Sequence, residues 1–371
     1  MTDEEFVDLS VRHQLGNVAS RNLRQDQQAH DFAFQNASGS ALSWAHHEAR
    51  PRALNGWVRT DHGDRGLPQF ARPQLGKHVD LTKYVQPLHE AILAGWDLDL
   101  IIDMQDRRVR ELRLPDGGLF PTLSFNRLKD ESDRILWPLP LYHDIAGEAF
   151  LGGIDPNAVP WSEKRNLIVW RGIPGGRASP KVDMRKETLR LPVMLTRHAS
   201  GTLPTSEAAA LISTFPRHRF VERMFGDQRA DVGFISRQGV ILDREPLLAA
   251  FERPRTSRTQ MQHFKYLAVL RGNDLGSSFF WTMNSGSLGL VMETPFDSFA
   301  SCHFRPWEHY VPFREDMSDF DANFAWCQAH QEECREMTMR AAATCRLLAR
   351  ADLRTRVFQA IVTQLRDSLR L

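Results

Sequence analysis

The sequence predicts an α/β fold, and the strongest indication lies between residues 266 and 293. An apolar, strand-like run at Tyr266–Leu270 ends in the charged turn Arg271–Asp274, and a turn of small residues follows. The aromatic run Phe279–Met283 has helical character, and the apolar run Leu288–Met292 ends in Glu293. This order of strand, turn, helix and strand is typical of a Rossmann-type half-domain, which forms a nucleotide pocket at the carboxyl ends of its strands.

The other elements follow from hydrophobic periodicity and from the positions of proline and glycine. In the first half, Met1–Pro51 is compatible with helices, and residues 81–94 have apolar side chains at helical spacing around Pro87. Short strands are predicted at Leu98–Ile102, Leu119–Phe125, Leu167–Arg171 and Gly239–Leu242. Further helices are predicted at Ser206–Phe215, at Leu247–Phe251 and, in two or three segments, over residues 319–371.

The chain length bounds the domain organisation. A chain of 371 residues is long for one core and predicts two or three domains. Pro138 and Pro140 begin a long connection, and the strand Leu167–Arg171 follows it. We therefore place a first α/β domain at residues 1–160, a second at 161–345 and a C-terminal helix at 346–371.

Charge and cysteine usage narrow the class of protein. A net charge of +1 provides no overall field that would attract nucleic acid. We see no signal peptide after the acidic Asp3–Glu5 start, and no apolar run reaches the roughly 20 residues that a transmembrane helix needs. The four cysteines show no paired pattern, which fits a reducing compartment. The expected location is the cytoplasm, with at most a peripheral attachment at an inner membrane.

Several motifs together resemble glycosyltransferase family 90. They are Lys265–Leu267, Leu270–Asn273, Ser285–Leu288, Glu293, Pro306–Pro312, Trp326–His330, Ile168–Gly172, Gly175–Arg177 and, more loosely, Leu98–Asp106 and Pro121–Phe125. That family includes protein O-glucosyltransferases and bacterial enzymes that modify lipopolysaccharide or capsule, and the chain is more similar to the bacterial branch. The resemblance implies a GT-B-like architecture, in which two Rossmann-type domains face a central cleft and the C-terminal helices pack back on the N-terminal domain.

The resemblance also implies a donor site for a UDP-sugar in the second domain. Arg171, Arg177 and Arg271 would bind the diphosphate, because a guanidinium is permanently charged and offers a fork of donors. Glycines would let the backbone approach the donor closely, and small residues would present backbone N–H groups to the phosphates. Glu293 would accept hydrogen bonds from the ribose hydroxyls. The remaining predicted donor-binding residues are Gly172, Gly176, Gly272, Asn273, Gly276, Ser277 and Ser278. The alternative for each arginine is a salt bridge at a strand end.

The acceptor side is predicted in the first domain. Asp106 follows the strand Leu98–Ile102 and matches by position the aspartate that removes the acceptor proton in the family's O-glucosyltransferases. Asp103 is a close competitor for the role of base, and Arg107 is a candidate to hold either carboxylate ionised. The alternative is that both aspartates are solvated turn residues paired with neighbouring arginines.

Two patterns suggest a metal but are discounted. Asp97-Leu98-Asp99 is a DxD, but it precedes the apolar run, whereas a metal-binding DxD should end one. Cys327, His330 and Cys334 share a helix face without an obvious fourth ligand, so core packing is favoured. We expect no metal and no cofactor beyond the UDP-sugar donor.

The leading interpretation is an inverting, metal-independent hexosyl- or pentosyltransferase. Its acceptor would be an oligosaccharide or lipid-linked glycan, such as lipopolysaccharide core or capsule. The alternatives are a metal-dependent GT-A enzyme that uses Asp97 and Asp99, and a nucleotide- or glycan-binding protein without turnover. A nucleic-acid-binding protein is poorly supported, because no basic-aromatic motif is present.

Overall fold

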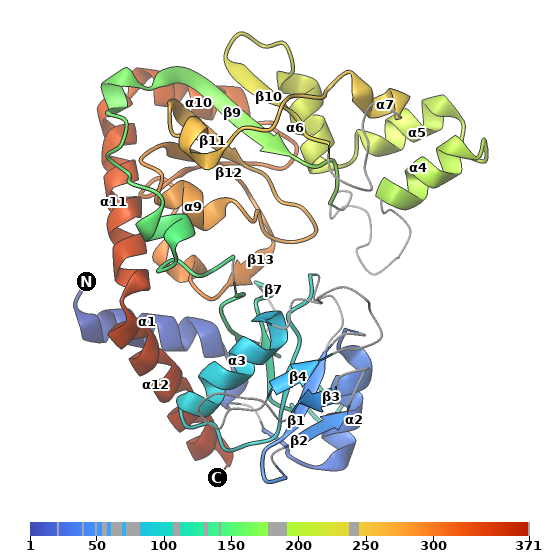
Figure 1. Ribbon diagram of the computed structural model, residues 1–371, viewed down its shortest axis with the longest axis vertical. Coiled ribbons are helices and arrows are strands. Elements are labelled where there is room, and N and C mark those ends of the chain that lie inside the picture. The colour runs from blue at the N-terminus through green and yellow to red at the C-terminus, as the bar shows by residue number, and fades with distance from the viewer. Residues whose placement is uncertain are drawn as a thin grey trace. The chain divides into compact units, whose positions relative to one another are not determined.

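The architecture was examined in a computed structural model. The structure describes residues 1–20, 22–38, 41–48, 50–53, 58–60, 69–71, 82–106, 112–129, 133–140, 142–176, 191–236 and 245–369. The chain divides into two compact units (Figure 1). Unit 1 contains Met1–Ala146, Phe296–His303 and Leu347–Leu371, and unit 2 contains Gly147–Pro295 and Phe304–Arg346.

Unit 2 is built on a five-stranded sheet in which every pair of neighbouring strands is parallel. Its strands are β9 (Arg165–Gly172), β10 (Ala230–Phe234), β11 (Phe264–Val269), β12 (Leu288–Met292) and β14 (Val311–Phe313). They lie in the order β10-β9-β11-β12-β14, which is the 2-1-3-4-5 order of doubly wound α/β proteins. The predicted α/β class is therefore confirmed, and the parallel sheet is consistent with a Rossmann-like fold.

Both faces of this sheet are buried. Alternate residues of β9 and β11, including Ile168, Trp170 and Tyr266, belong to one hydrophobic cluster. The residues between them, such as Val169 and Leu267, are equally buried on the opposite face. Burial on both faces explains why these strands are continuous apolar runs without a polar alternation.

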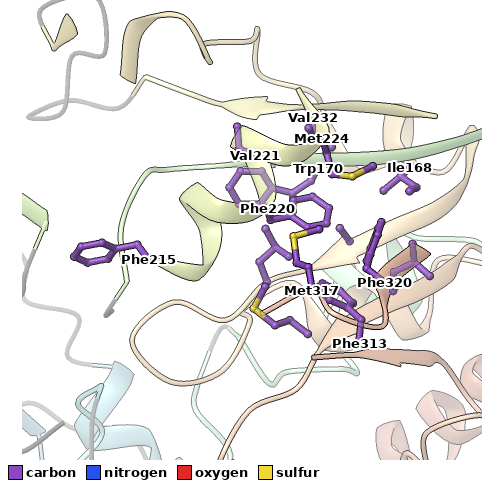
Figure 2. Close-up of a cluster of buried hydrophobic side chains, with 14 of the residues drawn as sticks. Ile168, Trp170, Phe215, Phe220, Val221, Met224, Val232, Phe313, Met317 and Phe320 are labelled. Carbon is purple, nitrogen blue, oxygen red and sulfur yellow. The ribbon is translucent and has the colours of Figure 1, made fainter. Parts of the chain in front are cut away.

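Several helices of unit 2 lie against the strands of the sheet. The helices described in this unit are α4 (Leu191–Ala199), α5 (Thr205–Ile212), α6 (Pro216–Met224), α7 (Pro246–Ala249), α8 (Arg258–Met261), α9 (Phe279–Met283), α10 (Phe320–Ala329) and most of α11 (Gln331–Ala349), with one-turn helices at Glu148–Gly152 and Trp161–Glu163. Helix α6 begins with Pro216 at its first position, where the missing N–H costs no hydrogen bond. Figure 2 shows the buried cluster, with Phe220, Val221 and Met224 of α6 among its labelled side chains.

Unit 1 contains a second five-stranded sheet, which is mixed. Its order is β2-β1-β5-β6-β8, with β5, β6 and β8 parallel and with β1 antiparallel to both of its neighbours. The strands are β1 (Leu42–Ala45), β2 (Arg50–Ala53), β5 (Leu100–Ile102), β6 (Thr122–Ser124) and β8 (Ile135–Leu136). Two small antiparallel pairs join β3 (Val58–Thr60) to β4 (Gln69–Ala71) and β7 (Asn126–Leu128) to β13 (Phe296–Ser298).

The helices of unit 1 bring the N-terminal and the C-terminal helix together. They are α1 (Asp3–Leu15), α2 (Gln27–Asn36), α3 (Thr82–Leu93) and α12 (Ala351–Leu369), with single turns at Val18–Ser20 and Ser301–His303. Thr2 and Glu5 form a capping box that fixes the start of α1. Helices α1 and α12 lie side by side, and Arg350 forms an ion pair with Asp3 at 2.7 Å (Figure 1). The predicted strand at Gly239–Leu242 lies outside the described residues.

Among the described residues, no helix combines the length and the apolar character needed to cross a bilayer.

Candidate functional site

The strand order of unit 2 creates one distinctive place on its sheet. The chain leaves β9 to form β10 on one side and then returns to form β11 on the other side. In doubly wound sheets, ligands bind outside the carboxyl ends of the two strands that flank such a reversal. Arg171 and Gly172 end β9, and Arg271 and Gly272 follow β11 after Leu270. Because the strands are parallel, these two predicted segments lie at the same edge of the sheet.

The loops that follow β9 and β11 touch each other at glycines. Gly176 has a φ of +105°, and a Cβ atom placed on it would lie 2.8 Å from the carbonyl oxygen of Gly272. Any larger residue at 176 would push the two loops apart, so glycine is required there by both conformation and space. The structure thus brings Gly176 and Gly272 together, although they are far apart in the sequence.

The neighbouring glycines also have internal packing roles. A Cβ on Gly172 would lie 2.5 Å from the indole of Trp170, and a Cβ on Gly276 would lie 2.7 Å from Val269. These two glycines therefore allow the protein to pack closely on itself at the edge of the sheet. Their predicted contacts with a ligand stay predictions.

Arg271 is the most buried cation at this edge. Its side chain is 1% exposed, and its Nε atom lies 2.5 Å from a carboxylate oxygen of Glu315, whose side chain is 14% exposed. Its Nη1 atom donates to the carbonyl oxygen of Gly272 at 3.4 Å. Glu315 follows β14, so this ion pair connects the loops after two strands. Sequence reasoning missed Glu315 because 44 residues separate it from Arg271.

The guanidinium of Arg171 binds other groups of the protein. Its Nη2 atom lies 2.6 Å from the carboxylate of Asp231, and its Nε atom donates to the carbonyl oxygen of Pro254 at 3.0 Å. Its Nη1 atom donates to the carbonyl oxygens of Trp170 and Asp231. These contacts hold β9 to β10, which agrees with the salt-bridge alternative. A direct donor contact by Arg171 stays a prediction, and Arg177 lies outside the described residues.

The turn before α9 and the end of β12 complete this edge. The N–H of Phe279 donates to the carbonyl oxygen of Gly276, and Ser278 is the N-cap residue of α9 without a side-chain cap bond. Ser277 and Glu293 are exposed, and Asn273 is half-buried. Glu293 directly follows β12, and its N–H donates to the carbonyl oxygen of Phe313. Burial and, to a smaller degree, the charge of Glu293 raise the pKa of Tyr310 to about 12.

The two acceptor-side aspartates have different environments in unit 1. Asp103 is buried, and its carboxylate accepts hydrogen bonds from the backbone N–H and the hydroxyl of Ser38 at 3.0 and 2.5 Å. Asp106 is exposed. A base must reach an acceptor hydroxyl, so the geometry favours Asp106 over Asp103 for that role. Arg107 lies outside the described residues.

Neither discounted metal pattern resembles a ligand cluster. Asp97 forms an ion pair with Arg366 at 2.9 Å, and a carboxylate oxygen of Asp99 accepts from the N–H of His46 at 2.8 Å. Both aspartates precede β5, as the sequence predicted.

The cysteine and histidine side chains on α10 and α11 are packing groups. Cys327 and Cys334 are buried in the core of unit 2, and the His330 ring stacks on Trp326 with centroids 4.5 Å apart. Cys327 and Cys334 thus pack in the core of unit 2, and His330 packs on Trp326.

A second arginine, which the sequence motifs did not single out, lies at the same edge as Arg271. Arg217, near the start of α6, donates to the carbonyl oxygen of Ile173 at 3.4 Å. A Cβ on Gly272 would lie 2.8 Å from its Nη2 atom. It lies in a stretch rich in arginines, and others of that stretch form exposed ion pairs, such as Arg229 with Asp227.

Comparison with known proteins agrees with this part of the structure. Residues 243–354 match glycosyl transferase family 90. Protein O-glucosyltransferase 3 of Rattus norvegicus is 28% identical over 286 residues, which are 74% of this chain and 48% of that protein. The Mus musculus protein of the same name is 25% identical over 286 residues, or 74% of this chain and 49% of its own length. The uncharacterized protein 027R of Frog virus 3 is 26% identical over 198 residues, or 52% of this chain and 19% of its own length.

The chain spans about half the length of the O-glucosyltransferases that it matches. These relatives come from rodents and a virus, so the predicted bacterial branch stays a prediction. The matched segment contains Arg271, Glu293 and Glu315, which all lie at or directly after the carboxyl ends of strands in unit 2. This match confirms the resemblance of the chain to glycosyl transferase family 90.

Proposed function

We propose that the protein is an inverting glycosyltransferase that transfers a sugar from a UDP-sugar to a hydroxyl group of a glycan. The donor diphosphate would lie at the carboxyl ends of β9 and β11. The observation that carries this proposal is the meeting of Gly176 and Gly272 beside Arg271 at the strand reversal. The similarity to glycosyl transferase family 90 supports the same class of reaction.

The chemistry requires stabilisation of the leaving group. As the bond between the anomeric carbon and the diphosphate oxygen breaks, negative charge grows on UDP. Arg271 would stabilise that charge, since a guanidinium held in a buried position needs little reorganisation during the reaction. Glu315 fixes the Nε side of this guanidinium and thereby its orientation.

The acceptor hydroxyl needs a base on the opposite face of the sugar. In-line attack on an α-linked donor forms the new bond to the anomeric carbon, inverts its configuration and gives a β-linked product. Asp106 would take the hydroxyl proton as the nucleophile attacks, and UDP would leave with the electron pair of the broken bond. The exposed position of Asp106 supports this assignment.

The proposed acceptor is an oligosaccharide or a lipid-linked glycan, with lipopolysaccharide core or capsule as the first choices and a cytoplasmic location. The reaction is proposed to need no metal. The GT-A alternative is less favoured, because Asp97 is paired with Arg366 and Asp99 is bonded to the backbone of His46. A nucleotide- or glycan-binding protein without turnover is the second candidate.

Calorimetric binding of UDP and of a panel of UDP-sugars, with and without EDTA, tests the proposal. We expect UDP binding that EDTA does not change and that Arg271→Ala weakens, together with transfer from one preferred UDP-sugar. Loss of binding in EDTA and recovery with manganese would favour the GT-A alternative. Binding without transfer across a broad acceptor panel would favour the binding protein, and no binding under either condition would refute the donor site.

A further inference from the structure

Arg217 has an unusual position on α6. Val221 and Met224 lie four and seven residues further along this helix, on the face that packs into the core of unit 2. Arg217 therefore continues a buried face at the end of the helix where the core stops. Arg223 on the same helix behaves differently, since it forms an ion pair with Asp321 and donates to the carbonyl oxygen of Met317.

The guanidinium of Arg217 lies between the two loops that flank the strand reversal. Its Nη1 atom donates to the carbonyl oxygen of Ile173, in the loop after β9. Its Nη2 and Cζ atoms lie 2.8 and 3.2 Å from the position that a Cβ of Gly272 would occupy. Glycine at position 272 thus makes room for this guanidinium directly beside Arg271.

The local electrostatics favour an anion here. Arg217 and Arg271 both reach Gly272, because Arg271 donates to its carbonyl oxygen. Glu315 forms an ion pair with Arg271, and the first turn of α6 contains no acidic residue. A site that combines these features is suited to a group with two or more negative charges.

We propose that Arg217 is a donor-binding residue whose guanidinium contacts the diphosphate of the nucleotide sugar. This inference rests on the proposed function for the identity of the ligand. It assigns to Arg217 the direct phosphate contact that the sequence assigned to Arg171, while Arg171 holds β9 to β10. Arg217 on α6 and Arg271 in the loop after β11 then approach the diphosphate at the strand reversal.

The test compares Arg217→Gln with wild-type protein and with Arg223→Gln, a matched control on the same helix. Calorimetry of the full chain with UDP, uridine and inorganic pyrophosphate separates the phosphate contribution from that of the nucleoside. We expect Arg217→Gln to weaken UDP and pyrophosphate binding at least tenfold and to leave uridine binding within twofold. Arg223→Gln should bind UDP within twofold of wild type. Arg217→Lys, which keeps the charge but loses the planar fork, should fall between wild type and Arg217→Gln.

The outcomes separate this inference from the proposed function. Equal UDP affinity in wild type and Arg217→Gln would overturn the role of Arg217 while leaving the transferase proposal intact. Arg217-dependent binding of pyrophosphate, without sugar transfer from any UDP-sugar, would support the anion site and refute the transferase. If Arg217→Gln does not fold, Arg217→Lys decides, and an unchanged UDP affinity in that variant would count against the inference. Wild-type protein that binds neither UDP nor pyrophosphate would overturn it.

Discussion

Replacing Glu315 by glutamine removes the carboxylate that faces the buried guanidinium of Arg271. The two atoms of this ion pair lie 2.5 Å apart, and the two side chains are 1% and 14% exposed. Removing one partner of a buried ion pair costs about 3–5 kcal/mol, because the other charge stays buried without compensation. The residual exposure of Glu315 places the expected loss at about 3 kcal/mol. For a domain of this size, that loss lowers Tm by about 6–12 °C.

Thermal and urea unfolding of Glu315→Gln and of a matched surface variant measure this loss. Glu308→Gln is the control, because its 3.5 Å pair with Arg305 joins side chains that are 44% and 68% exposed. Exposed pairs of this kind contribute at most about 1 kcal/mol. The double variant Glu315→Gln, Arg271→Met should recover part of the stability, since it no longer buries a lone charge. A Glu315→Gln protein within about 1 kcal/mol of wild type would refute the reasoning.

Three further predictions concern separate parts of the chain. Asp106→Asn should reduce sugar transfer by about 10²–10⁴-fold with an unchanged Tm. Asp103→Asn, by contrast, should lose about 1–3 kcal/mol of stability, because its hydrogen bonds to Ser38 are weakened. Transfer assays and unfolding curves of both variants test this, and full activity of Asp106→Asn would exclude Asp106 as the base. Gly176→Ala should destabilise unit 2 by at least about 1–2 kcal/mol from its positive φ alone, and an unchanged urea midpoint would contradict the tight loop contact. Burial lowers the pKa of Lys164 from 10.5 to about 8, so the unfolded chain binds more protons than the folded chain between these pH values. The free energy of unfolding should therefore rise with pH across that window. Urea titrations at a series of pH values should show this slope in wild type and not in Lys164→Met, and the same slope in both proteins would show that other groups cause it.

The sequence predicted some elements of unit 2 to the residue. The runs Phe279–Met283 and Leu288–Met292 coincide with α9 and β12, because each is largely apolar and bounded by polar or charged residues. Other strands of unit 2 were harder to predict, because their sequences contain residues that are uncommon in strands. β10 contains Asp231 and Gly233, and β14 contains Pro312, which is tolerated because β14 is the last strand of the sheet.

The arrangement of the candidate site depended on facts that a single sequence does not contain. The motif residues at the ends of β9 and β11 were recognisable because glycine and arginine interrupt apolar runs. Their neighbours Glu315 and Arg217 were not, because only the strand order brings the loop after β14 and the start of α6 to the same edge. Likewise, the hydrogen bonds of Arg171 with Asp231 arise from the pairing of β9 with β10, which local patterns do not specify.

The discontinuous composition of unit 1 has a consequence for biosynthesis. Its first segment ends at Ala146, but α12 lies in a segment that begins at Leu347 and is therefore translated after all of unit 2. At about 5–20 residues per second, the ribosome needs roughly 10–40 s to bridge that interval. During this time α1, whose buried residues include Phe6, Val11 and Leu15, lacks the helix α12 that lies against it. The nascent N-terminal segment is thus a natural client for a chaperone, and unit 2 can complete its own sheet first.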